Sequence, residues 1–215
     1  MTTARHYTPL DRLLNLANDA LTTIAGKPFG TGRPSPAEDR EAANLDAGQA
    51  KHAAGLMRVN HAGEVSAQAL YQGQALTARE EGVREKMQRA AAEENDHLVW
   101  CEQRLTELDS RPSLLNPLWY AGSFAIGALA GAVGDKWSLG FIVETERQVI
   151  KHLEEHLAKL PADDDKSRAV LIQMKEDESH HATTAMQSGA AELPAPVKKI
   201  MAITSMVMTK TAYWI

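Results

Sequence analysis

Two short motifs in the sequence pair a glutamate with a histidine three residues later. Glu94 is followed by His97, and Glu178 is followed by His181. On a helix, residues i and i+3 lie on one face, so a carboxylate oxygen and an imidazole nitrogen can reach the same ion. Each motif is therefore a candidate pair of metal ligands, as long as a helix carries it.

A lone glutamate stands before each motif, at a distance that fits one helix hairpin. Glu64 lies 30 residues before Glu94, and Glu146 lies 32 residues before Glu178. The same ligand spacing thus occurs twice in the chain. These glutamates also interrupt apolar stripes of helical period, which predicts that they face a core.

Four glutamates aimed at one core need compensation, because a buried carboxylate without a partner is costly or takes up a proton. No lysine or arginine lies on these stripes at the same level. Two divalent cations would balance four carboxylates, and oxygen and nitrogen ligands without sulfur suit iron or manganese. The predicted ligands are Glu64, Glu94, His97, Glu146, Glu178 and His181. An Asp177/His180 pair is the alternative in the second motif, but it does not copy the first.

The elements that must position these ligands are helices. Apolar residues of helical period predict helices at roughly 48–80, 83–109, 114–134, 137–159, 165–188 and 195–213. With this ligand set, they predict an all-α, ferritin-like four-helix bundle with a long apolar crossover helix and an extra C-terminal amphipathic helix. Residues 1–44 are interpreted as an amphipathic segment with a Gly/Pro-rich linker, and residues 45–215 as the domain of the metal centre.

Two segments indicate contact with a membrane. Residues 112–134 contain no charged residue over 23 positions. A membrane span, a buried helix and an interfacial helix with Trp119 and Tyr120 at headgroup level are the alternatives for them. Residues 196–215 carry three lysines and no acid, which suits an anionic lipid surface, and a helix that completes the bundle is the alternative.

Composition excludes other classes of protein. A formal net charge of −5 over 215 residues argues against a nucleic-acid binder. The single cysteine excludes an internal disulfide framework and a cysteine-based metal site. An iron-storage or peroxide-scavenging protein with the same ligands, and a membrane-associated scaffold whose glutamates are surface charges, remain as rival interpretations.

Several distinctive motifs occur together between residue 45 and the C-terminus. They are Asn60-His-Ala-Gly-Glu64, Glu93-Glu-Asn-Asp-His97-Leu, Pro117-Leu-Trp, the Gly/Ala-rich stretch to Gly134, Glu144-Thr-Glu146 and Asp177-Glu-Ser-His-His181. Their combination resembles the demethoxyubiquinol hydroxylase family, the membrane-associated di-iron monooxygenases of late ubiquinone biosynthesis.

The resemblance implies an enzyme that uses O2 to hydroxylate the benzoquinol ring of a polyprenylated demethoxyubiquinol (2-polyprenyl-3-methyl-6-methoxy-1,4-benzoquinol). It implies two iron ions per chain, with manganese as the alternative, and bridging by either Glu94 and Glu178 or Glu64 and Glu146. It also implies a peripheral protein on the cytoplasmic side of the cell membrane, with other ubiquinone-biosynthesis proteins as partners.

Two more residues are candidates for contact with the substrate. His152 lies six positions after Glu146, about 240° around the helix, so this geometry does not make it a ligand. We interpret it as a candidate proton or electron relay near the substrate, with a position at the surface or behind the ligands as the alternative. Tyr71 is a candidate for lining the substrate path, with ordinary packing as the alternative.

Overall fold

The computed structural model describes residues 8–25 and 30–215, and every regular element in these ranges is an α-helix. Residues 1–7 and 26–29 of the predicted N-terminal segment lie outside the described residues. The helices are α1 (Pro9–Ala25), α2 (Ala47–Thr77), α3 (Glu81–Glu107), α4 (Asn116–Val133), α5 (Asp135–Lys159), α6 (Asp165–Gln187) and α7 (Ala195–Ala212). The six helices predicted after residue 45 are confirmed, with ends that differ by no more than three residues.

Local sequence sets where the helices begin. Asp46 and Gln49 form a capping box at the start of α2: Gln49 N donates to Asp46 Oδ1 over 2.8 Å, and Asp46 N donates to Gln49 Oε1 over 2.9 Å. At the start of α6, Ser167 N donates to Asp164 Oδ1 over 3.0 Å. Gly134 separates α4 from α5 with a φ of 136°, a value that L side chains rarely adopt.

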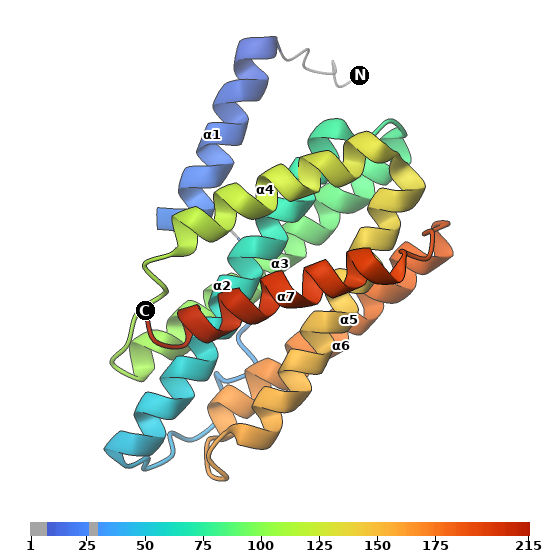
Figure 1. The fold of residues 1–215 in the computed structure, drawn as a ribbon. Helices are drawn as coiled ribbons and strands as arrows, with labels where there is room; N and C mark the ends of the chain where they lie inside the picture. Colours follow the sequence, from blue (N-terminus) through green and yellow to red (C-terminus); the bar gives the residue numbers. More distant parts are fainter. Residues whose placement is uncertain (1–7, 26–29) are drawn as a thin grey trace.

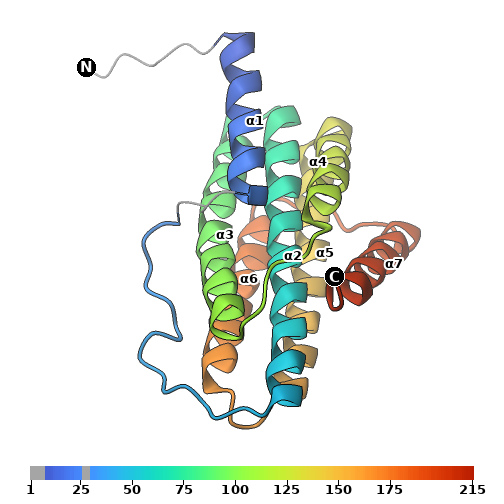
Figure 2. The same cartoon turned by 90° about the vertical axis from the view of Figure 1, so that its left-hand side faces the viewer.

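Helices α2, α3, α5 and α6 form the four-helix bundle, and α4 is the crossover between its two hairpins (Figures 1 and 2). The two hairpins are α2 with α3 and α5 with α6. Helix α4 packs along α2, and α7 runs obliquely over α2 and α5 on the same side of the bundle (Figure 1). This arrangement confirms the predicted ferritin-like bundle with its crossover and C-terminal helices.

Glycines allow α4 to approach α2 closely. A Cβ atom on Gly127 would lie 2.3 Å from Leu70 O, and one on Gly73 would lie 2.3 Å from Phe124 O. The two backbones therefore touch, and one face of α4 is buried against the bundle. Within the described ranges, no helix combines the length and the apolar character that crossing a bilayer requires.

The suggested headgroup position of Tyr120 is wrong. Its ring is 6% exposed and packs with Val65, Ala69 and Leu98, while its hydroxyl donates to Gln72 Oε1. The ring turns inward because α2 offers an apolar surface to the ring and a half-buried acceptor to the hydroxyl.

Two apolar clusters fill the bundle, and a polar layer lies between them. One cluster includes Met57, Leu105, Leu153 and Leu171. The other includes Ala67, Met87, Val143 and Ala185. All four bundle helices pass from one cluster to the other, and each carries its predicted ligands in between. The layer is thus screened from water at both ends.

Candidate metal centre

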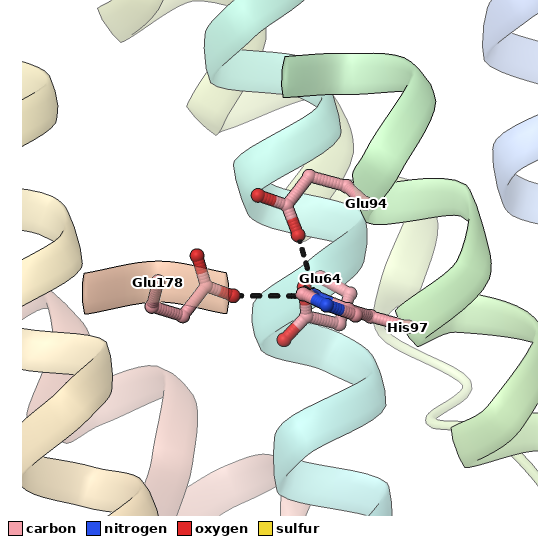
Figure 3. Close-up of side chains that lie close together, drawn as sticks. All are labelled: Glu64, Glu94, His97 and Glu178. Atoms are coloured by element: carbon pink, nitrogen blue, oxygen red, sulfur yellow. Dashed lines mark hydrogen bonds and ion pairs between the residues drawn. The ribbon is translucent and has the colours of Figure 1, made fainter. Parts of the chain in front are cut away.

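One group of buried side chains gathers around His97 (Figure 3). His97 Nδ1 lies 3.5 Å from Glu64 Oε2, 2.9 Å from Glu94 Oε2 and 3.2 Å from Glu178 Oε1. These side chains come from α2, α3 and α6, and one donor atom from each lies within 4.8 Å of all the others. We call Glu64, Glu94, His97 and Glu178 the His97 group.

A second group gathers around His181 and shares two members with the first. His181 Nδ1 lies 3.3 Å from Glu94 Oε1 and 3.0 Å from Glu178 Oε2. Glu146 of α5 completes it, with donor atoms again within 4.8 Å of one another. We call Glu94, Glu146, Glu178 and His181 the His181 group. The structure thus brings all six predicted residues together, with Glu94 and Glu178 between the two histidines.

The four carboxylates are almost wholly buried, with exposed fractions between 0% and 3%. Burial, followed by the charge of Glu94, raises the pKa of Glu64 well above its usual value. Burial, followed by the charge of Glu178, does the same to the pKa of Glu146. In the part of the chain that the structure describes, no lysine or arginine forms an ion pair with these carboxylates, so cations must come from elsewhere.

The two histidines respond in the opposite sense. Burial lowers the pKa of His97, but Glu94 and the other carboxylates outweigh it and raise this pKa well above its usual value. The pKa of His181 is likewise raised, to about 12, by hydrogen bonds to Glu178 and Glu94 against the effect of burial. Without other cations, the cluster stabilises its negative charge by holding protons.

Divalent cations fit this cluster. They would replace the protons, return both imidazoles to the neutral form that binds metals, and use the four carboxylates as ligands. Oε1 of Glu94 is buried and lies 3.3 Å from His181 Nδ1, so both atoms can coordinate the same ion. The donor set of oxygen and nitrogen suits iron or manganese.

Each histidine is also held from behind by an acid on the opposite helix. His97 Nε2 donates to Asp177 Oδ2 over 2.8 Å, and His181 Nε2 donates to Glu93 Oε2 over 2.7 Å. These bonds leave each Nδ1 for a metal ion and fix the ring orientation. Sequence reasoning missed both acids, although each directly precedes the glutamate of a motif. Asp177 pairs with His97, while its suggested partner His180 is exposed.

Tyr71 and His152 lie at different distances from this centre. Tyr71 is 3% exposed, and its hydroxyl donates to Glu146 Oε1. Burial, followed by the charge of Glu146, raises the pKa of Tyr71, so the hydroxyl stays protonated. His152 lies outside both groups and pairs its Nε2 with Ser205 Oγ of α7 at 3.1 Å. A relay role for His152 stays a prediction.

A cavity of about 120 Å³ adjoins the His181 group between α3 and α6. Its lining includes the buried residues Tyr71, Ile142 and His181 and the exposed residues Lys86 and Arg89. An engineered apolar cavity of about 150 Å³ accepts benzene, so this cavity suits O2 or part of a six-membered ring.

A ferritin-like bundle with a buried layer of four glutamates and two histidines defines a class of helical metalloenzymes. The sequence matches the family model described as ubiquinone biosynthesis protein COQ7 over residues 51–212. The chain belongs to this family.

Three relatives that match over nearly the full length carry the same name. The chain is 59% identical to the 3-demethoxyubiquinol 3-hydroxylase of Azotobacter vinelandii, covering 99% of both chains. It is 56% identical to the protein of the same name from Nitrosococcus oceani, covering 98% of this chain and 99% of the relative. It is also 56% identical to the protein of that name from Acinetobacter baylyi, covering 98% of this chain and 100% of the relative. The chain is accordingly an enzyme of the oxygenase class.

Proposed function

We propose that this chain hydroxylates the benzoquinol ring of a polyprenylated demethoxyubiquinol, using O2 at a carboxylate-bridged di-iron centre. Residues 45–215 form the catalytic domain in this proposal. The names of the relatives support the substrate. One observation carries the di-iron centre: two ligand groups overlap in two glutamates, as a pair of adjacent ions would require.

The proposed ligand roles follow from the two groups. Glu64 and His97 would hold one ion, Glu146 and His181 would hold the other, and Glu94 and Glu178 would be shared between them. The choice between the two bridging pairs falls on Glu94 and Glu178, because only these belong to both groups. Iron is the proposed metal, and manganese offers the same coordination.

The proposed reaction inserts one atom of O2 into a ring C–H bond and reduces the other atom to water. It consumes two electrons and two protons from a donor, for which the quinol and NADH are the candidates. When bound, two ferrous ions supply adjacent electrons to O2. The protein contributes a dry layer, fixed carboxylates and the hydroxyl of Tyr71, which orients Glu146 beside the cavity.

The most direct test of the activity measures oxygen uptake with a short-tail demethoxyquinol and the mass of the product. We expect protein loaded with about two iron ions per chain to add one oxygen atom, which comes from ¹⁸O2 when this isotope is supplied. A product of unchanged mass, formed with fully iron-loaded protein and a competent reductant, would reject the hydroxylase assignment.

We further propose that the enzyme binds the cytoplasmic side of the cell membrane through α4 and α7. Both helices lie on one side of the bundle (Figure 1) and expose large apolar side chains. These are Leu118, Ile126, Leu129, Val133, Val197, Ile200, Ile203, Met206 and Val207. Apolar side chains on neighbouring helices suit insertion into the interface. The prenyl tail would stay in the lipid or lie along these helices.

Co-sedimentation with anionic vesicles tests the membrane proposal. Replacing Leu129 and Ile200 by glutamate should weaken binding to the vesicles by about 10-fold or more, because each change puts a charge at the interface. Ile172→Glu is the matched control, since Ile172 is a 43% exposed apolar residue of α6, a helix that packs mainly on α5 and α3. Equal binding by all variants would contradict this membrane face.

A further inference from the structure

Residues 30–33 form a short strap that lies beside α3 before the chain runs on to α2 (Figure 2). Thr31 fastens it to α3: its backbone N donates to Asp96 Oδ1 over 2.7 Å, and its Oγ1 donates to Asp96 Oδ2 over 2.6 Å. Asp96 is 2% exposed and directly precedes His97. The strap is thus bonded to the residue next to a proposed ligand.

Arg33 extends this contact from α3 to α6. Its Nε donates to Asp96 Oδ2 over 2.8 Å, and its Nη1 lies 2.9 Å from Asp177 Oδ2. The guanidinium also stacks on the ring of Trp100, with its carbon 4.9 Å from the ring centroid. One planar side chain therefore joins two acids on different helices, which a lysine could not do with the same geometry.

The oxygen of Asp177 that Arg33 contacts is the one that accepts from His97. Oδ2 lies 2.8 Å from His97 Nε2, so a chain of contacts runs from Arg33 through Asp177 to His97. Metal-binding histidines depend on such outer partners for the orientation and basicity of the ring. A guanidinium on the same carboxylate fixes its position and balances its charge.

Packing at Gly30 indicates that the strap is fitted to Asp96. A Cβ atom at position 30 would lie 2.2 Å from Asp96 Oδ1. The carboxylate cannot move aside without breaking its bonds to Thr31 and Arg33. A residue with no side chain is therefore needed where the strap meets α3.

We propose that the strap positions one half of the metal centre, with Arg33 as a positioning residue that acts on His97 through Asp177. The inference rests on the metal centre of the proposed function. The other half has no such device among the described residues: Glu93, which holds His181, is 37% exposed and forms no ion pair with lysine or arginine. The strap should therefore affect the two ions unequally.

The test uses the full chain loaded with ⁵⁷Fe(II) under anaerobic conditions. Iron affinity is measured by competition with a chelator, and the two ions are distinguished by Mössbauer spectroscopy. We expect Arg33→Gln to weaken one of two sites by about 10-fold and to change one of two quadrupole doublets. Asp177→Asn should change the same doublet. Combining Asp177→Asn with Arg33→Gln should change that doublet little further. Glu93→Gln should change the other doublet. Combining Glu93→Gln with Arg33→Gln should therefore change both doublets.

Arg84→Gln is the matched control, because the Arg84 side chain is 35% exposed, against 37% for Arg33, and forms an ion pair with Glu81 on the surface. It should leave both doublets unchanged. The strap does not position His97 if Arg33→Gln changes both doublets equally. The same conclusion follows if Arg33→Gln changes neither doublet while Asp177→Asn changes one. A wild-type protein that binds fewer than two iron ions would instead contradict the proposed function.

Discussion

The His97 group and the His181 group share two glutamates but differ in what lies behind the histidine. Behind His97 stands Asp177, whose side chain is 16% exposed and is held by Arg33. Behind His181 stands Glu93, which is 37% exposed, beside a cavity of about 120 Å³. The first group is closed by a segment of the chain, and the second borders open space.

We infer from this difference a division of labour between two nearly equivalent sets of proposed ligands. A closed, hydrogen-bonded set holds its ion in a fixed geometry. A set that borders a cavity can accept O2 and a ring, and Tyr71 couples Glu146 to that cavity. We infer that substrate approaches from the His181 side, while the His97 side secures the centre.

Removing a shared glutamate should have the largest effect, since it belongs to both groups. We expect Glu178→Ala to lose both iron ions and to lower hydroxylation by at least about 100-fold, while the helices stay folded. Metal analysis and circular dichroism measure these effects. Glu176→Ala, at an exposed position on the same helix, is the control. Two iron ions retained by Glu178→Ala would remove the basis for shared ligands.

Tyr71→Phe separates the roles of the two groups. It removes the hydrogen bond to Glu146 and alters one wall of the cavity. We expect turnover to fall by about 10-fold or more, with both iron ions still bound, because Tyr71 orients a ligand and is not one. Tyr120→Phe, which removes a hydroxyl bound to Gln72, should have little effect on turnover. Normal turnover in Tyr71→Phe would show that the reaction does not depend on the hydrogen bond that orients Glu146.

The pH dependence of stability tests how firmly the helices around the His97 group are packed. His156 of α5 bonds to Asn60, one turn before Glu64 on α2, over 2.7 Å. Burial lowers the pKa of His156 to about 4. The folded state binds this proton less readily than the unfolded state, so stability falls as the pH drops from about 6.5 through 4.

The expected contribution of His156 is a loss of about 2 kcal/mol between about pH 7.5 and pH 5. It is measured by urea unfolding of the metal-free wild type and His156→Asn at both pH values, because the difference between the two proteins cancels the other titrating groups. Equal losses of stability in both proteins would mean that His156 is accessible to protons in the folded state.

The six candidate ligands were predictable because helical spacing alone places them. Glu94 and His97 lie on one face of any helix, and the same pattern with Glu178 and His181 implies a second helix facing the first. Their meeting in one layer followed from charge balance, since four buried carboxylates cannot stay apart from cations.

The residues behind the ligands were not predictable in the same way. Asp177 and Glu93 reach histidines on the opposite helix, which depends on the register between α3 and α6. Arg33 lies 63 residues before Asp96 in the chain, in a Gly/Pro-rich stretch without periodicity. The Tyr120 hydroxyl turns inward to donate to Gln72 of α2. Nothing in the sequence of α4 indicates this acceptor.

The central claim is that six side chains hold two adjacent ions, with Glu94 and Glu178 between them. Anomalous diffraction at the iron edge, from anaerobic crystals loaded with Fe(II), tests it most directly. The account predicts two peaks per chain, about 3.5–4 Å apart, one against His97 and one against His181, with Glu94 and Glu178 contacting both. A single peak, or peaks away from these six residues, would contradict it.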